Sequence, residues 1–155
     1  MDYYRCENPD CGFVAEQEEP DVCPRCGGTF FVALNEEEMT AGDWVSMGNR
    51  AVDEKRETDA LACYQRAAAL GDPLGLTNLG WCLEAGIGVE ADPKQAVLLY
   101  AQAASQEYMP ALTNLGYCYT YGIGVEVDYA KALECFQKGA EQGFPRAQFL
   151  LGEAY

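Results

Sequence analysis

Apolar positions after residue 35 follow the period of helices. Ala60, Tyr64 and Ala68 are spaced four residues apart, so a helix would carry them as one apolar stripe. A second kind of segment, in which leucine and glycine stand between a small and a large residue, alternates with these stripes, as at 75–83. Turns that contain glycine or proline separate the two kinds of segment. The pattern predicts antiparallel pairs of helices.

The whole pattern returns every 36 residues. This interval separates NLG at 78–80 from NLG at 114–116, GIGV at 86–89 from GIGV at 122–125, and the successive stripes that begin at Ala60, Ala96 and Ala132. Self-similarity at such a period is typical of stacked helix pairs. We therefore expect a mainly α protein, an α-solenoid with units at about 36–73, 74–109 and 110–145 and a half unit at 146–155.

The glycines within the repeat predict where helices end and where they pack closely. GIGV supplies a helix end, and the aspartate–proline pair that follows it at 92–93 supplies a cap and a first turn for the next helix. Gly80, Gly116 and Gly152 stand in register inside the first helix of each unit. A helical glycine costs about 1 kcal/mol relative to alanine, so we expect another backbone to pack closely there.

The segment 1–35 has a different character and contains four of the eight cysteines. They form two knuckles, Cys6-x4-Cys11 and Cys23-x2-Cys26, and a glycine follows each. Glycine permits a left-handed turn, which aims backbone N–H groups at thiolate sulfurs and stabilises their charge. A segment this small lacks a sufficient core, and a metal bound by four thiolates would supply the missing folding energy. We expect one structural Zn²⁺ on these four cysteines.

This N-terminal portion resembles the zinc-ribbon and rubredoxin-like family over roughly residues 3–34. CPRCGG at 23–28 matches that family well, whereas four residues instead of the usual two separate the cysteines of the first knuckle. The resemblance leaves open a rubredoxin-like iron that transfers one electron, or a zinc site that acts as a redox switch. Four thiolates leave no open position for a catalytic water, so metal-assisted hydrolysis is disfavoured.

The end of the ribbon is expected to run almost directly into the first helix. Phe13-Val14-Ala15 and TFFVAL at 29–34 are rich in residues that favour strands. Asn35 and the three glutamates after it suit a helix cap and an acidic first turn. We therefore predict a helix that opens at Asn35 and a ribbon that docks on the first repeat.

The repeated segments resemble the Sel-one-like repeat family, a relative of the tetratricopeptide repeat, over about residues 37–155. The resemblance rests on the combination A-x3-LG-x2-[YL]-x2-GIGV followed by A-x3-[YF]-x3-A, with a degenerate first unit that lacks the GIGV turn. It implies a groove lined by first helices that binds a protein. The positions implied to face this groove are Thr77, Asn78, Trp81, Glu84 and Ala85, then Thr113, Asn114, Tyr117, Thr120 and Tyr121.

Two interpretations stay open for the most prominent of these residues. Asn78 and Asn114 suit an extended peptide backbone, because an amide both donates and accepts hydrogen bonds, or they order the stack through an inter-helix hydrogen bond. Trp81, Tyr117 and Tyr121 are aromatic anchors for a partner or simple packing residues. The cationic clamp that holds a terminal carboxylate in some tetratricopeptide domains is missing at these positions.

Composition narrows the function classes. The chain has 10 Lys and Arg against 25 Asp and Glu, a formal charge of -15, which disfavours nucleic-acid binding. It has no histidine, which removes the usual Ser/His and Cys/His catalytic arrangements. No signal sequence or membrane-length apolar run is visible, so we expect a cytoplasmic protein without a membrane partner.

The sequence therefore favours a non-catalytic adaptor over a thiolate-metal redox protein. Its partner should be a protein or peptide of basic and apolar character. Cys63, Cys82, Cys118 and Cys135 follow the repeat, and we expect them to be small buried residues. The half unit at 146–155 carries apolar residues with no second helix to cover them, which predicts a homodimer contact through this segment.

Overall fold

The computed structural model describes residues 3–16, 20–28 and 31–143. The predictions for 146–155, namely the half unit and the dimer contact, lie outside these residues. The described elements are β1 (Tyr3–Cys6), β2 (Val14–Glu16), β3 (Phe31–Leu34), α1 (Ala41–Asp53), α2 (Glu57–Ala69), α3 (Pro73–Ala85), α4 (Pro93–Ala104), α5 (Met109–Tyr121) and α6 (Tyr129–Glu141).

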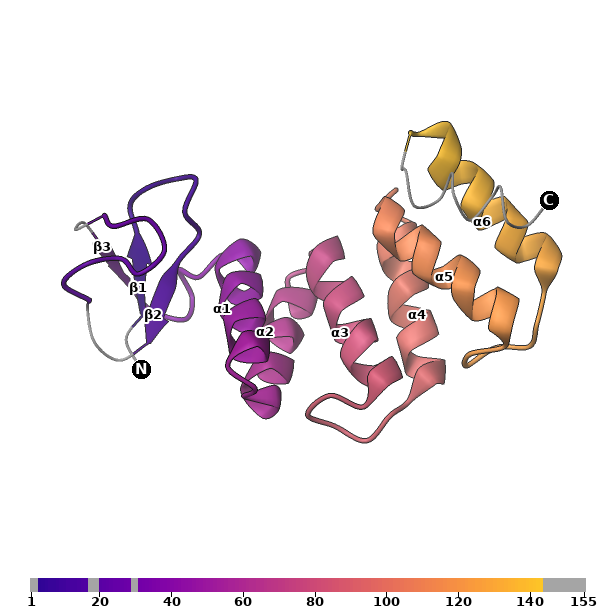
Figure 1. The fold of residues 1–155 in the computed structure, drawn as a ribbon, viewed down its shortest axis with the longest axis horizontal. Helices are drawn as coiled ribbons and strands as arrows, with labels where there is room; N and C mark the ends of the chain where they lie inside the picture. The colour runs from indigo at the N-terminus through magenta and orange to yellow at the C-terminus, as the bar shows by residue number, and fades with distance from the viewer. Residues whose placement is uncertain (1–2, 17–19, 29–30, 144–155) are drawn as a thin grey trace.

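The described helices form a solenoid, as the 36-residue period predicts. Each helix packs on its neighbours in the chain, with α1 and α2, α3 and α4, and α5 and α6 as antiparallel pairs. Figure 1 shows the pairs following one another along an arc, with the strands at one end and α6 at the other. None of the described helices combines the length and the apolar character that crossing a bilayer requires.

The caps of the helices agree with the turn chemistry read from the repeat. Asp72, Asp92 and Asp128 precede α3, α4 and α6, and each side chain accepts a hydrogen bond from the N–H three residues later. Gly86 and Gly122 end α3 and α5 in the left-handed conformation, with φ of 75° and 68°. Local chemistry therefore sets the same ends of α3 and α5 and the same starts of α4 and α6, whereas α5 starts after Tyr108 without a side-chain cap.

Each first helix places a glycine against an aromatic ring on its own second helix. The pairs are Gly48–Tyr64, Gly80–Tyr100 and Gly116–Phe136. A Cβ on Gly80 would lie only 2.7 Å from a ring carbon of Tyr100. The predicted close approach is therefore present, but the prediction that another backbone makes it is wrong at these positions. Gly152 lies outside the described residues.

The GIGV turns join neighbouring units. A Cβ on Gly88 would lie 2.5 Å from the carbonyl oxygen of Glu57, at the start of α2. Gly124 approaches the carbonyl oxygen of Pro93, at the start of α4, in the same way. Each turn therefore closes on the second helix of the preceding unit, and only glycine fits there.

The first helix begins after Thr40, so the prediction that Asn35 opens it is wrong. The side-chain oxygen of Asn35 accepts hydrogen bonds from the N–H groups of Glu37 and Glu38, at 3.0 and 3.1 Å, but these close only a turn. Thr40 and Asp43 instead form a reciprocal capping box: the Thr40 hydroxyl oxygen accepts from the Asp43 N–H, and the Asp43 carboxylate accepts from the Thr40 N–H. Asn35 and Glu38 form a similar reciprocal pair, because the Asn35 N–H donates to the Glu38 carboxylate at 2.9 Å, so capping hydrogen bonds alone do not select the later start.

The strands form an antiparallel sheet in the order β2-β1-β3, and this sheet docks on the first helix pair. Their shared apolar core consists of Tyr3, Val14, Leu34, Met39, Trp44, Val45, Met47, Cys63 and Ala67. Arg5 on β1 pairs with Asp43 on α1 at 2.8 Å, and Arg50 donates a hydrogen bond to the carbonyl of Val14. The predicted docking of the N-terminal module is therefore present.

Candidate functional site

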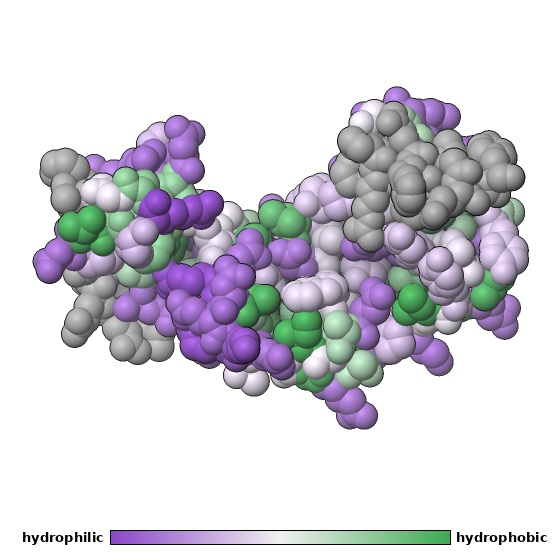
Figure 2. All heavy atoms as spheres, in the orientation of Figure 1, coloured by the Kyte–Doolittle hydropathy of each residue, from purple (hydrophilic) through white to green (hydrophobic). Residues whose placement is uncertain are grey.

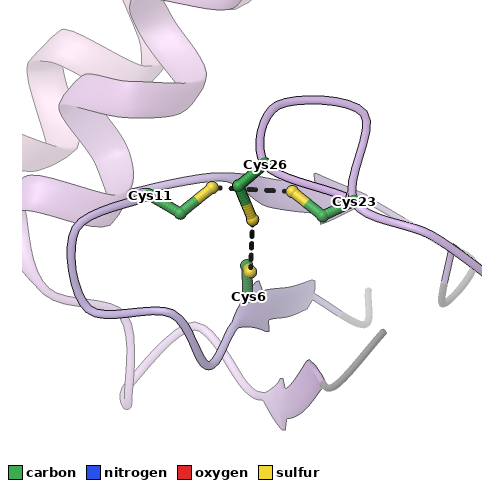
Figure 3. A group of neighbouring side chains, drawn as sticks. All are labelled: Cys6, Cys11, Cys23 and Cys26. Atoms are coloured by element: carbon green, nitrogen blue, oxygen red, sulfur yellow. Dashed lines mark hydrogen bonds between the residues drawn. The ribbon is translucent and has the colours of Figure 1, made fainter. Parts of the chain in front are cut away.

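The four N-terminal cysteines meet at one point beside the sheet. Cys6 ends β1, Cys11 lies in the loop before β2, and Cys23 and Cys26 lie in the loop between β2 and β3. Figure 3 shows their side chains converging from these separate segments. All four sulfurs lie within 4.8 Å of one another. The two knuckles predicted from the spacing are therefore brought together as one possible ligand set.

The sulfur positions suit a tetrahedral metal. The sulfurs of Cys6 and Cys26 are 3.6 Å apart, and those of Cys11 and Cys23 are 3.5 Å apart. A tetrahedron with Zn–S bonds of about 2.3 Å has edges of about 3.8 Å. The donor set is all thiol and closed, so a metal held there would cross-link the two loops and offer no site for substrate.

Backbone N–H groups point at the sulfurs, as the glycine-ended knuckles predict. Asn8 donates to Cys6, which lowers the pKa of that thiol, but desolvation and the neighbouring thiols leave this pKa above its usual value. Burial raises the pKa of Cys11 to about 12, opposed by the N–H of Phe13. The N–H of Gly28 lowers the pKa of Cys26 to about 7. The surroundings therefore favour a thiolate most strongly at Cys26.

A groove lies between α3 and α5, the first helices of two successive units. It encloses about 530 Å³, a usual size for a binding pocket, and we call it the α3–α5 groove. Asn78, Trp81, Asn114 and Tyr117 line it, as the repeat resemblance implies. Figure 2, in the orientation of Figure 1, shows strongly hydrophilic residues gathered over α1 and α2, with polar and apolar residues mixed toward the middle of the arc.

The asparagines offer their amides to the groove. Neither Asn78 nor Asn114 makes a side-chain hydrogen bond to another described residue, and both are partly exposed. The inter-helix hydrogen bond considered for them is therefore not observed in the part of the chain that the structure describes. This leaves both amides available to pair with a peptide backbone.

The aromatic residues take different positions. Trp81 is 42% exposed, and Tyr117 stacks on Tyr121 with ring centroids 5.8 Å apart. Tyr121 is 67% exposed and stands beside the groove, not among its described lining residues. Thr113 is fully buried and donates to the carbonyl of Met109, so the expectation that it faces the groove is wrong.

Further lining residues of the groove were not predicted from the sequence: two lie in the first turns of α3 and α5, and three lie outside these helices. They are Leu74, Tyr100, Tyr108, Pro110 and Ile123. Tyr100 belongs to an apolar stripe, and its hydroxyl donates a hydrogen bond of 2.7 Å to the carboxylate of Glu84 in the groove wall. Burial, and next this hydrogen bond, raise the pKa of Tyr100. Nothing in the sequence indicates that Glu84 and Tyr100, which are 16 residues apart on different helices, are in contact.

The four helical cysteines are buried, as predicted. Burial raises the pKa of Cys63 and of Cys82 to about 11 and that of Cys118 to about 12. It also raises the pKa of Cys135. These thiols are protonated near neutral pH, and all eight cysteines are free in the structure. They act as small apolar side chains.

The family follows from the helical repeats. The model of the Sel1 repeat matches residues 48–72, 73–108 and 110–144, more than half of the chain. The chain belongs to the Sel1 repeat family. The resemblance to Sel-one-like repeats is thereby confirmed, and the cysteine cluster before the Sel1 repeats is consistent with a zinc-ribbon-like module. A search of curated proteins gave no match.

Solved structures share the Sel1 fold. A Sel1 repeat protein from Oxalobacter formigenes is 30% identical with a TM-score of 0.69, over 75% of this chain and 48% of that chain. A protective antigen present in uropathogenic Escherichia coli strains, which displays an SLR fold, is 29% identical with a TM-score of 0.72, over 76% of this chain and 26% of that chain. The present chain thus spans less than half the length of either.

A third structure shows the fold alone. Cysteine rich protein B of Helicobacter pylori is 20% identical with a TM-score of 0.57, over 73% of this chain and 98% of that chain. Sel1 repeats in general mediate protein–protein interaction and are in general not catalytic. This general role agrees with a groove that presents amides and aromatic rings.

Proposed function

We propose that this protein is a non-catalytic adaptor that binds a peptide segment of a partner protein in the α3–α5 groove. The observation that carries the proposal is the meeting of two repeats in one hollow of about 530 Å³, with an asparagine and an aromatic residue from each. Free amides can pair with an extended backbone, and exposed rings can bury apolar side chains of the partner. Tyr121 extends the aromatic surface beside this hollow.

The partner segment is basic and apolar. The chain carries a formal charge of -15, so positively charged segments approach it favourably and associate faster at low salt. Leu74 and Trp81 supply exposed apolar surface at the groove. The same charge opposes the phosphate backbone of a nucleic acid.

The N-terminal module, at about residues 1–35, has a structural role in this proposal. Cys6, Cys11, Cys23 and Cys26 would hold one Zn²⁺, which supplies a cross-link between loops and no reaction. The module then covers the first unit of the helical domain at 36–155, where an open end would expose apolar surface. Eight free thiols suit a reducing compartment, which supports the cytoplasm as the location.

A peptide selection tests the groove. We expect a displayed library of random peptides to yield binders rich in Lys or Arg and apolar residues. The double variant Asn78→Ala and Asn114→Ala should weaken the selected peptides by about tenfold or more, because two hydrogen-bonding amides are lost. Isothermal titration calorimetry measures the change.

The matched control removes two amides elsewhere. Gln65 and Gln102 are exposed on the second helices α2 and α4, so Gln65→Ala with Gln102→Ala should leave affinity unchanged. A selection that yields no binder, or binders equally weakened by both double variants, contradicts the proposal.

A further inference from the structure

Glu84 is the sole charged residue among the described residues that line the α3–α5 groove. It forms no ion pair with any described residue, although the structure contains several ion pairs elsewhere, such as Arg5–Asp43. Its carboxylate is partly buried beside Trp81, which lies three residues earlier on the same helix. A negative charge is therefore held in a hollow with aromatic walls and no described cation.

The hydroxyl of Tyr100 fixes the position of this carboxylate. Tyr100 is 1% exposed, and its oxygen lies 2.7 Å from one carboxylate oxygen of Glu84. The buried ring cannot follow a moving side chain, so the carboxylate is oriented before any partner arrives. Its second oxygen has no hydrogen bond to a described residue. Preorganisation of this kind lowers the cost of ordering on binding.

The neighbouring units do not repeat this charge. One repeat later, Thr120 replaces Glu84 and donates to the carbonyl of Gly116 on its own helix, while Phe136 replaces Tyr100 and has no hydroxyl. In the first unit the hydroxyl of Tyr64 donates to the neutral amide of Asn49, at 2.6 Å. The described array therefore presents one oriented carboxylate in its groove.

We propose that the α3–α5 groove selects an arginine side chain of the partner, whose guanidinium pairs with Glu84 between the rings of Trp81 and Tyr117. This inference rests on the proposed function, since it names the residue that the peptide places at the groove's single charge. A unique charged position also fixes which residue of the peptide lies over which repeat, because a shift along the groove would leave the guanidinium without a carboxylate.

Arginine fits this site better than lysine. A guanidinium is planar, stacks on aromatic faces and donates in a fork that matches a carboxylate, whereas an ammonium is a compact and strongly hydrated charge. A groove with aromatic walls and a carboxylate held by a hydroxyl offers both interactions at once. Lysine would satisfy the charge but gain less from the rings.

The test uses synthetic copies of the tightest peptides from the library selection, acetylated and amidated. Each arginine is replaced in turn by citrulline, which keeps the shape and removes the charge, and by lysine. Binding is followed by NMR through the indole N–H signal of Trp81, with the buried indole of Trp44 as an internal reference. For one position we expect citrulline to weaken binding about tenfold and lysine to weaken it less.

Glu84→Gln then identifies the contact. The amide oxygen of glutamine still accepts from Tyr100, so packing is kept while the charge is removed. This variant should bind the arginine and citrulline peptides equally. Glu90→Gln removes one exposed charge from the turn of the same unit and should preserve the tenfold difference.

Each contrary result has one meaning. Selected peptides that contain no arginine, or that lose equal affinity in Glu84→Gln and Glu90→Gln, overturn this inference while leaving peptide binding in the groove intact. A library that yields no binder overturns the proposed function and this inference together.

Discussion

At the scale of single residues, the glycine–aromatic pairs decide how closely the two helices of a unit pack. Tyr100 is nearly fully buried, and its hydroxyl is bound to Glu84, so its ring cannot yield to a new neighbour. Gly80 is therefore needed because no larger side chain fits beside the ring. It is not needed for backbone flexibility, which is a disadvantage inside a regular helix.

Gly80→Ala should lower the free energy of unfolding by about 1–3 kcal/mol, because the added methyl group would lie 2.7 Å from the ring of Tyr100. Helix propensity alone predicts the opposite sign, a gain of about 1 kcal/mol. The midpoint of urea unfolding measures the difference.

The control is Gly42→Ala in the first turn of α1, where the nearest atom to the added methyl would be the Thr40 hydroxyl oxygen at an ordinary 3.7 Å. This variant should be as stable as the parent or more so. Equal destabilisation by both changes would show that space at Gly80 is not the cause.

The positions of some residues were predictable from the sequence where chemistry and spacing coincide. The four N-terminal cysteines lie together, as their spacing predicts, and Asn78 and Asn114 line a groove of the kind that the family resemblance implies. The 36-residue period could not show that a ring, not a backbone, faces Gly80, because a period states which positions are equivalent and not what touches them. It also could not show that Thr113 turns its hydroxyl back to its own helix.

At the scale of elements, the sheet and α1 stabilise one another. Trp44 and Val45 of α1 pack against Tyr3, Val14 and Leu34 of the strands. The strands in turn are short, with three or four residues each, and the loops between them meet at the cysteine cluster. Order at the cysteine cluster is therefore coupled to order in the first repeat.

We expect native mass spectrometry to find one Zn²⁺ per chain, and removal of zinc by a chelator to speed amide hydrogen exchange in α1 by at least about tenfold. Exchange in α5 should stay unchanged, because a solenoid transmits order mainly between neighbours. Cys23→Ser should reproduce the effect without chelator. Protein that contains iron or no metal, or α1 exchange unaffected by Cys23→Ser, would contradict the structural zinc site.

The ends of helices were predictable from the sequence where the local residues are compatible with only one structure. The Asp caps and left-handed glycines of the full units mark helix ends directly. The prediction of a helix start at Asn35 was wrong because an asparagine followed by glutamates is equally compatible with a turn. The capping box of Thr40 and Asp43, five residues on, competes for the same role and also binds Arg5 of the sheet. Tertiary contact decided between two locally similar starts.

At the scale of the whole molecule, the net negative charge opposes folding and would favour the binding of the proposed basic peptide. The formal charge is -15, and most of the described ion pairs are exposed, so like charges repel across the compact state. The same field would attract the basic peptide that we propose for the groove. Screening by salt therefore acts on the two equilibria with opposite signs.

Raising KCl from about 0.02 M to about 0.5 M should raise the thermal midpoint of unfolding by a few degrees, while it weakens the binding of a basic peptide. Circular dichroism measures the first effect and calorimetry the second. Sucrose, which stabilises without screening charge, is the control and should raise the midpoint without weakening the peptide. A midpoint that falls with KCl would show that ion pairs outweigh the repulsion.

The turns that close on the preceding unit, Gly88 on Glu57 and Gly124 on Pro93, bear on how such a gene can grow. Both joints use the same backbone atoms at the same offset, so a tandem duplication of residues 73–108 would create at its boundary only joints that this chain already makes. Lengthening the array then requires no new interface to arise by mutation. Each inherited copy would add one more first helix, and with it a new stretch of binding surface open to independent selection.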